Sequence, residues 1–282
     1  MKNLSPLFNA QNNNVAPKEF IFFVISQLHK ELNKKKNIDK NNSYENQDQA
    51  NELAMFKLFK EKFQNENMSI ISDLFYGCFH ISIKCSNFHV IKHNFEIFPY
   101  LIFDLEAVKQ NKIDNWINRE QQMNNPQMQL NYECLKNMNS VTIYDCFDYF
   151  EKGQILQDND GIPCNICMNP HNKSYYQTVI YSPPEILIII LDRSQQSEIQ
   201  LEYLEDLNLS NYIEEKKLGT TFKLISVVKV ENGNFVACCK YLNLNEQQWY
   251  RCDDNSISKI SNFKNQIVHS GLVHILFYQK CD

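Results

Sequence analysis

The sequence predicts an α+β fold, with helices first in the chain and an antiparallel sheet after them. Apolar residues recur at helical spacing before residue 64 and alternate with period two from residue 75. A continuous apolar run, ILIIIL, follows at Ile186–Leu191. Hydrophobic residues make up 43% of the 282 residues, which is enough to bury a sizeable core.

Two helices are expected near the start of the chain. The first spans residues 17–34, begins at Pro17 and ends in lysines, which complement the negative end of the helix dipole. Its apolar residues cover more than one face, so it should be covered on more than one side. They are Phe20, Ile21, Phe22, Phe23, Val24, Ile25, Leu28 and Leu32. The second helix is expected from the spacing of Leu53, Phe56, Phe59 and Phe63, and residues 33–50 between them form a polar linker.

The strands are expected in the later part of the chain. Alternation of Phe75, Gly77, Phe79, Ile81 and Ile83 with more polar residues predicts a half-buried strand, and Ile186–Leu191 predicts a fully buried one. Further strands are expected at 222–230, 235–241, 248–252 and 273–279. Residues 107–139 are rich in Asn and Gln and should mix loop with a short helix, whereas residues 141–156 should be helical.

Charge and cysteine content exclude several classes of function. The net charge is −5 and only three of the 28 basic residues are arginine, which argues against nucleic acid as a partner. No apolar run is long enough to span a membrane. The sequence shows no secretory signal, so its ten cysteines are expected to be reduced and to serve in the core, a metal site or catalysis. The expected location is intracellular, the cytoplasm above all, with cytoskeletal or ciliary association left open.

A series of segments, taken in order, resembles one known family. They are LHKEL (Leu28–Leu32), SIISDLFYG (Ser69–Gly77), Cys85 with Cys164-x-x-Cys167, Leu101–Leu105, PEILIIILDR (Pro184–Arg193), Phe222–Val228, Gly233–Lys240, WYRCDD (Trp249–Asp254) and ILFY (Ile275–Tyr278). Each is weak alone, but their order over nearly the whole chain is specific. The chain resembles the ubiquitin-specific proteases, the papain-like deubiquitinases built as thumb, palm and fingers.

The resemblance implies one ubiquitin-specific-protease-like domain over residues 1–282, with a palm and fingers antiparallel sheet and an incomplete helical thumb. Residues 1–70 would hold the remnant thumb helices. Residues 71–190 would form the fingers and part of the palm, and residues 191–282 the rest of the palm.

The resemblance also implies a degenerate catalytic site. The family's nucleophile lies in a G-N-T-C-Y box upstream of the LHxEL segment, whereas this sequence has no cysteine before Cys78, so the nucleophile is expected to be absent. The family's histidine position is Asn234, whose amide cannot shuttle a proton. Asp253 matches the acidic third member but would have no imidazole to orient. Whether the gene extends upstream to a cysteine box is left open.

No other residues rebuild a catalytic triad. Cys238 and Cys239 are adjacent on one strand, so one should face the core and the other the opposite side. Both are expected to be packing residues. His29 and His274 are likewise expected to be surface or packing histidines.

A metal site is half preserved. Fingers of this family often bind zinc through two C-x-x-C pairs, and the second pair is intact at Cys164 and Cys167. The first pair has Cys85, but Phe88 stands where its second cysteine should be. His89 gives a Cys85-x₃-His89 spacing, so zinc held by three cysteines and one histidine is one alternative. The other is a fingertip that has lost zinc.

The favoured function is a catalytically inactive pseudoenzyme that serves as a structural or protein-binding module in a larger assembly. Residues 1–34 are expected to contact another protein chain, unless residues 107–139 fold back and cover the first helix. Two alternatives remain: an active deubiquitinase whose nucleophile is supplied elsewhere, and a non-catalytic reader that binds ubiquitin. The short VKVENG segment before Asn234 favours the scaffold over the reader.

Overall fold

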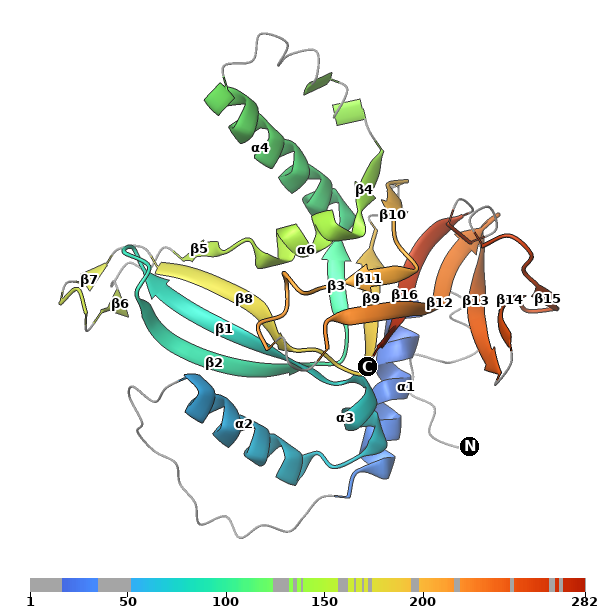
Figure 1. Ribbon diagram of the computed structural model, residues 1–282, viewed down its shortest axis with the longest axis horizontal. Coiled ribbons are helices and arrows are strands. Elements are labelled where there is room, and N and C mark those ends of the chain that lie inside the picture. Colours follow the sequence, from blue (N-terminus) through green and yellow to red (C-terminus); the bar gives the residue numbers. More distant parts are fainter. Residues whose placement is uncertain are drawn as a thin grey trace, which may run out of the picture. The chain divides into compact units, whose positions relative to one another are not determined.

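The computed structural model describes fourteen stretches of the chain, which divide into two compact units, Met1–Phe75 and Tyr76–Asp282 (Figure 1). The described residues are 17–34, 52–123, 132–133, 136–137, 139–156, 162–164, 166–168, 170–171, 174–193, 198–215, 219–243, 246–263, 267–268 and 271–281. Apart from Asn33 and Lys34, the expected linker at 33–50 lies outside them. Among the described helices, none is both long and apolar enough to cross a bilayer.

Within its described residues, the first unit holds three helices, α1 (Pro17–Leu32), α2 (Glu52–Glu66) and α3 (Ile70–Phe75). The two predicted helices are therefore confirmed. Asn33, directly after α1, connects that helix to the segment between α2 and α3. Its side chain donates to the Glu66 carbonyl and accepts from the Met68 N–H, both at 2.9 Å. His29 adds to this connection by hydrogen bonding, since its Nδ1 lies 2.7 Å from Ser69 Oγ.

The second unit is built on an eight-stranded sheet, which corresponds to the expected palm. Its strand order is β15-β14-β13-β12-β16-β9-β3, with β11 beside β12, and all pairs are antiparallel except β3 with β9. The strands are β3 (Leu101–Asp104), β9 (Ile186–Asp192), β11 (Asp206–Asn208), β12 (Thr221–Glu231), β13 (Asn234–Asn243), β14 (Glu246–Cys252), β15 (Ile257–Lys259) and β16 (Leu272–Lys280). All five strands predicted from residue 186 onward are present.

A four-stranded antiparallel sheet corresponds to the fingers, in the order β2-β1-β8-β5. It comprises β1 (Gly77–Cys85), β2 (Val90–Phe98), β5 (Gln154–Leu156) and β8 (Ser174–Ser182). The expectation that β1 is half-buried is wrong. Even its polar residues His80 and Ser82 are buried, and the His80 ring packs against the rings of Phe95 on β2 and Tyr181 on β8. Two short pairs complete the strands: β4 (Ser140–Thr142) with β10 (Gln200–Glu202), and β6 (Ile162–Pro163) with β7 (Pro170–His171).

Helices α4 (Leu105–Met123) and α6 (Ile143–Glu151) contribute buried residues to the same hydrophobic core as the strands of the larger sheet. The expectation of loop and a short helix at 107–139 is wrong for residues 107–123, which belong to the single helix α4. Asp104 caps α4 by accepting from the N–H groups of Glu106 and Ala107. Helix α6 begins with a capping box in which Thr142 and Asp145 bond to each other's backbone N–H.

Candidate functional site

Asn234, where the resemblance leads us to expect the family's histidine, lies at a tight hairpin between β12 and β13. Strand β12 ends at Glu231, β13 begins at Asn234, and these two residues are register partners. Asn232 and Gly233 join them with φ of 50° and 82°, the positive values that a type I′ hairpin turn requires. The connection before Asn234 is thus as short as the sequence predicts, and Asn234 itself is exposed.

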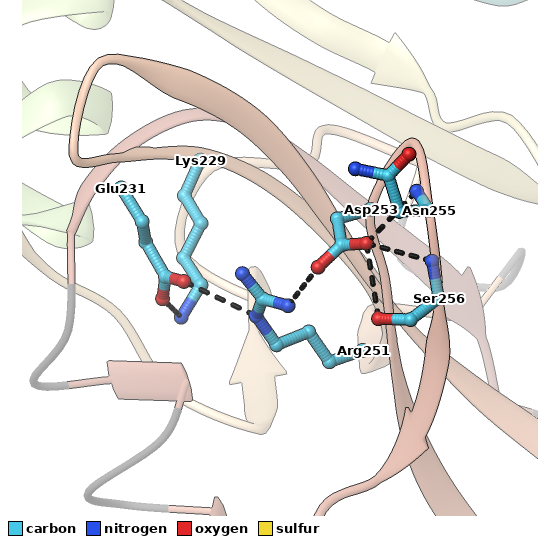
Figure 2. Close-up of polar contacts among 6 residues, drawn as sticks. All are labelled: Lys229, Glu231, Arg251, Asp253, Asn255 and Ser256. Atoms are coloured by element: carbon cyan, nitrogen blue, oxygen red, sulfur yellow. Dashed lines mark hydrogen bonds and ion pairs between the residues drawn. The ribbon is translucent and has the colours of Figure 1, made fainter.

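A network of ion pairs joins four charged side chains (Figure 2). Strand register puts three of them, Lys229, Glu231 and Arg251, on the face of the sheet that also carries Asn234. Lys229 Nζ lies 2.7 Å from Glu231 Oε1. The other oxygen of Glu231 accepts from Arg251 Nε at 3.2 Å, and Arg251 Nη1 donates to Asp253 Oδ2. We call Lys229, Glu231, Arg251 and Asp253 the charge ladder. It runs from β12 to the end of β14, across the intervening strand β13.

Asp253 also closes a turn through its second oxygen. Asp253 Oδ1 accepts from the N–H groups of Asn255 and Ser256 at 3.1 and 2.8 Å, and from the Ser256 hydroxyl at 3.0 Å. The hydrogen bond from Arg251, followed by those of the turn, lowers the pKa of Asp253 to about 2. In the part of the chain that the structure describes, no hydrogen bond or ion pair joins this carboxylate to a histidine.

The opposite end of the ladder is inside the protein. Lys229 is 0% exposed and the Glu231 side chain is 20% exposed, whereas the Arg251 side chain is 33% exposed. A buried ammonium needs an opposite charge beside it. The Glu231 carboxylate provides that charge to Lys229 and at the same time holds Arg251.

The adjacent cysteines on β13 face opposite sides, as their positions in one strand predict. Cys238 is fully buried, and burial raises the pKa of its thiol to about 11. Cys239 is exposed, with its Sγ 3.2 Å from Ser226 Oγ. His274 is half-buried and packs edge-on against Phe235, and burial together with Arg193 lowers the pKa of His274.

The fingertip brings together the four predicted metal ligands, Cys85, His89, Cys164 and Cys167. Their ligand atoms all lie within 4.8 Å of one another. Cys85 Sγ is 3.8 Å from Cys167 Sγ and 3.6 Å from His89 Nδ1, and His89 Nδ1 is 3.0 Å from Cys167 Sγ. Zinc–sulfur bonds of about 2.3 Å in a tetrahedron place two sulfurs roughly 3.8 Å apart. Three thiols and one imidazole gathered in this way can supply the four ligands of a structural zinc ion, with the His89 and Cys167 ligand atoms closer together than in an ideal tetrahedron.

Hydrogen bonds to sulfur favour the thiolate form at one of these ligands. The backbone N–H of Cys167 lowers the pKa of Cys164 to about 7, although burial raises that of Cys167. The Asn87 side chain donates to Cys167 Sγ at 3.3 Å. A metal-binding cysteine must be deprotonated, so donors placed in this way assist binding.

Sequence reasoning missed three of the four ladder residues, Lys229, Glu231 and Arg251. A signal was present for Arg251, which is one of three arginines and stands two residues before Asp253, on the same face of a predicted strand. It also missed a polar cluster in the fingers. There His80 Nδ1 lies 2.8 Å from Glu214 Oε2, and His80 Nε2 lies 2.8 Å from His93 Nδ1.

Comparison with known proteins places these features in a family context. The family model described as ubiquitin carboxyl-terminal hydrolase matches residues 1–278. Ubiquitin carboxyl-terminal hydrolase 12 of Saccharomyces cerevisiae is 27% identical over 191 residues, covering 61% of this chain and 14% of that protein. The human protein named inactive ubiquitin carboxyl-terminal hydrolase 17-like protein 8 is 20% identical over 254 residues, covering 82% of this chain and 41% of that protein.

Solved structures share the fold. The SAGA DUB module bound to monoubiquitin contains a chain that aligns with a TM-score of 0.61 and 20% identity, over 95% of this chain and 49% of that one. The present chain therefore spans about half the length of this structural neighbour and less than half that of the two curated relatives.

Proposed function

Because the chain belongs to the ubiquitin carboxyl-terminal hydrolase family, we propose that it is a catalytically inactive member that serves as a structural or protein-binding module of a larger assembly. The observation that carries the proposal is the state of Asp253. Its carboxylate is bonded to Arg251 and to a turn, while Asn234 stands at the position where the resemblance expects the family's histidine.

The chemistry of a cysteine protease explains why this arrangement does not support hydrolysis. An imidazole must take the thiol proton and return it to the leaving amine, and a carboxylate must orient that imidazole. Asn234 offers an amide that is not basic near neutral pH. A nucleophile supplied by another segment or chain would therefore still lack a base, which disfavours the alternative of an active deubiquitinase.

Protein partners are the second part of the proposal. The structural neighbour cited above was solved as a module bound to monoubiquitin, which makes ubiquitin one candidate partner. The two-residue turn before Asn234 favours a scaffold over a ubiquitin reader, because it provides no longer loop there to line a channel for the ubiquitin tail. We place the contact with a partner chain in residues 1–34. Of these residues, α1 exposes Phe20, Phe22, Leu28 and Leu32.

Zinc is the cofactor that the fingertip fits. Cys85, His89, Cys164 and Cys167 would hold it, and its role would be to fix the two fingertip loops. The proposal assigns no catalytic chemistry to the metal.

The test of inactivity uses the natural full-length protein and a fluorogenic ubiquitin-amide reporter, with an active family member as the positive control. We expect no hydrolysis and no labelling by a thiol-reactive ubiquitin probe. Asn234→His alone should also be inactive. If the natural protein hydrolyses the reporter, and replacing one of its cysteines by serine abolishes that hydrolysis, the proposal is overturned.

A further inference from the structure

Position 234 is not the only place where this site departs from a histidine–aspartate pair. We infer that Arg251 is the positioning residue that engages the Asp253 carboxylate and keeps it from serving an imidazole at position 234. The inference deepens the proposed function and rests on it in one respect, the identification of position 234 with the family's histidine.

The guanidinium of Arg251 lies between two carboxylates and bonds both (Figure 2). Its Nε is 3.2 Å from Glu231 Oε2, and its Nη1 donates to Asp253 Oδ2. An arginine stays protonated at all physiological pH values, and its planar fork suits two carboxylates at once. No change of pH in the range of enzyme activity therefore releases Asp253.

The second carboxylate that binds the Arg251 guanidinium is itself fixed in place by a buried ion pair. Glu231, its second partner, pairs with the fully buried Lys229, so the carboxylate that anchors Arg251 is itself fixed. On the other side, the turn at Asn255 and Ser256 occupies the remaining oxygen of Asp253. Both ends of the Arg251–Asp253 contact are thus constrained.

An imidazole at position 234 would meet opposing charges. Strand register places position 234 opposite Glu231 and on the same face as Lys229 and Arg251, with the Cys238 thiol further along β13. Asp253 follows the end of β14 and joins this group through its bond to Arg251. Two cations and two carboxylates then act on the ring. The cations lower an imidazole pKa and the carboxylates raise it, so the influences oppose each other while the ladder is intact.

Titration of the introduced imidazole by NMR tests the inference. In Asn234→His, we expect an eighth histidine signal, beside the seven natural ones, that titrates at or below about 6.5, the unperturbed value. In Asn234→His/Arg251→Met, loss of the cation frees Asp253, and the same signal should titrate about one unit higher. Adding Asp253→Asn to the double variant should reverse that rise, which a merely structural role of Arg251 would not produce.

The outcomes separate this inference from the proposed function. If the imidazole of Asn234→His already titrates as high as that of the double variant, or if removing Arg251 changes nothing, Arg251 does not control Asp253. Arg251→Gln, which removes the charge and keeps hydrogen-bond donors, provides the same comparison should the methionine variant not fold. Neither result depends on whether the natural protein hydrolyses ubiquitin, which the reporter assay decides.

Discussion

Lys229 and Glu231 lie two residues apart on the same face of β12, and the fully buried ammonium of Lys229 is 2.7 Å from the Glu231 carboxylate. Because Glu231 also binds Arg251, it is the residue on which the charge ladder depends. Removing Glu231 should therefore change the free energy of unfolding by a different amount from removing Lys229.

The first prediction concerns that inequality. Glu231→Gln removes the carboxylate from beside a buried charge and should lower the free energy of unfolding by about 3–5 kcal/mol. Lys229→Met, the matched variant, removes the buried charge itself and should cost far less or even stabilise the protein. Urea denaturation followed by circular dichroism measures both. Equal losses in the two variants would show that Lys229 is not stabilised through Glu231.

The pH dependence of stability gives a second prediction. The folded-state pKa of Asp253, about 2, lies below its unfolded value of about 3.9, so its contribution to stability is present above pH 4 and is lost as pH falls towards 2. The difference in unfolding free energy between the natural protein and Asp253→Asn should therefore be constant from pH 5 to 7 and shrink below pH 4. A difference that grew on acidification would contradict the assigned ionisation.

Zinc content is the third prediction. Protein purified without chelator should contain one zinc per chain by elemental analysis, held by Cys85, His89, Cys164 and Cys167. Cys164→Ser should lose the metal, whereas Cys252→Ser, which lies outside this cluster, should retain it. Metal-free natural protein would support the alternative of a fingertip that has lost zinc.

The fourth prediction concerns the proposed contact through residues 1–34. Protein isolated from its source should migrate with a larger complex, and Phe22→Asp, at a 52% exposed position, should release it. Glu31→Ala, at an exposed polar position of the same helix, is the control and should remain bound. A natural protein that is monomeric at cellular concentration would refute the contact.

The later strands could be predicted from sequence because their apolar pattern is dictated by burial in one sheet, as in Ile186–Asp192 and Leu272–Lys280. Helix α4 could not, since its Asn and Gln content resembles a loop and its stabilisation is tertiary. Lys112 of α4 bonds Asp145 of α6 at 2.8 Å, and Leu105 and Val108 are buried. Propensity is a weak guide where such contacts decide.

The fingertip cluster and the charge ladder also differ in how far the sequence predicts them. The C-x-x-C spacing alone predicts that Cys164 and Cys167 lie in one tight turn with their thiols close together. The resemblance adds Cys85, so the fingertip cluster could be predicted. The contact between Glu231 and Arg251 depends on register between β12, β13 and β14, which fixes which charges meet across strands. Sequence spacing carries no such information, and for that reason Arg251 and Glu231 were not expected as partners.

The turn at Asn232 and Gly233 also bears on how the larger sheet assembles. A two-residue loop closes at little entropic cost, and hairpins form within roughly 1–10 μs. By contrast, β9 must meet β16 from more than 80 positions away in the chain. We therefore expect the hairpin that carries Asn234 to form early and the distant strands to pair later and more slowly.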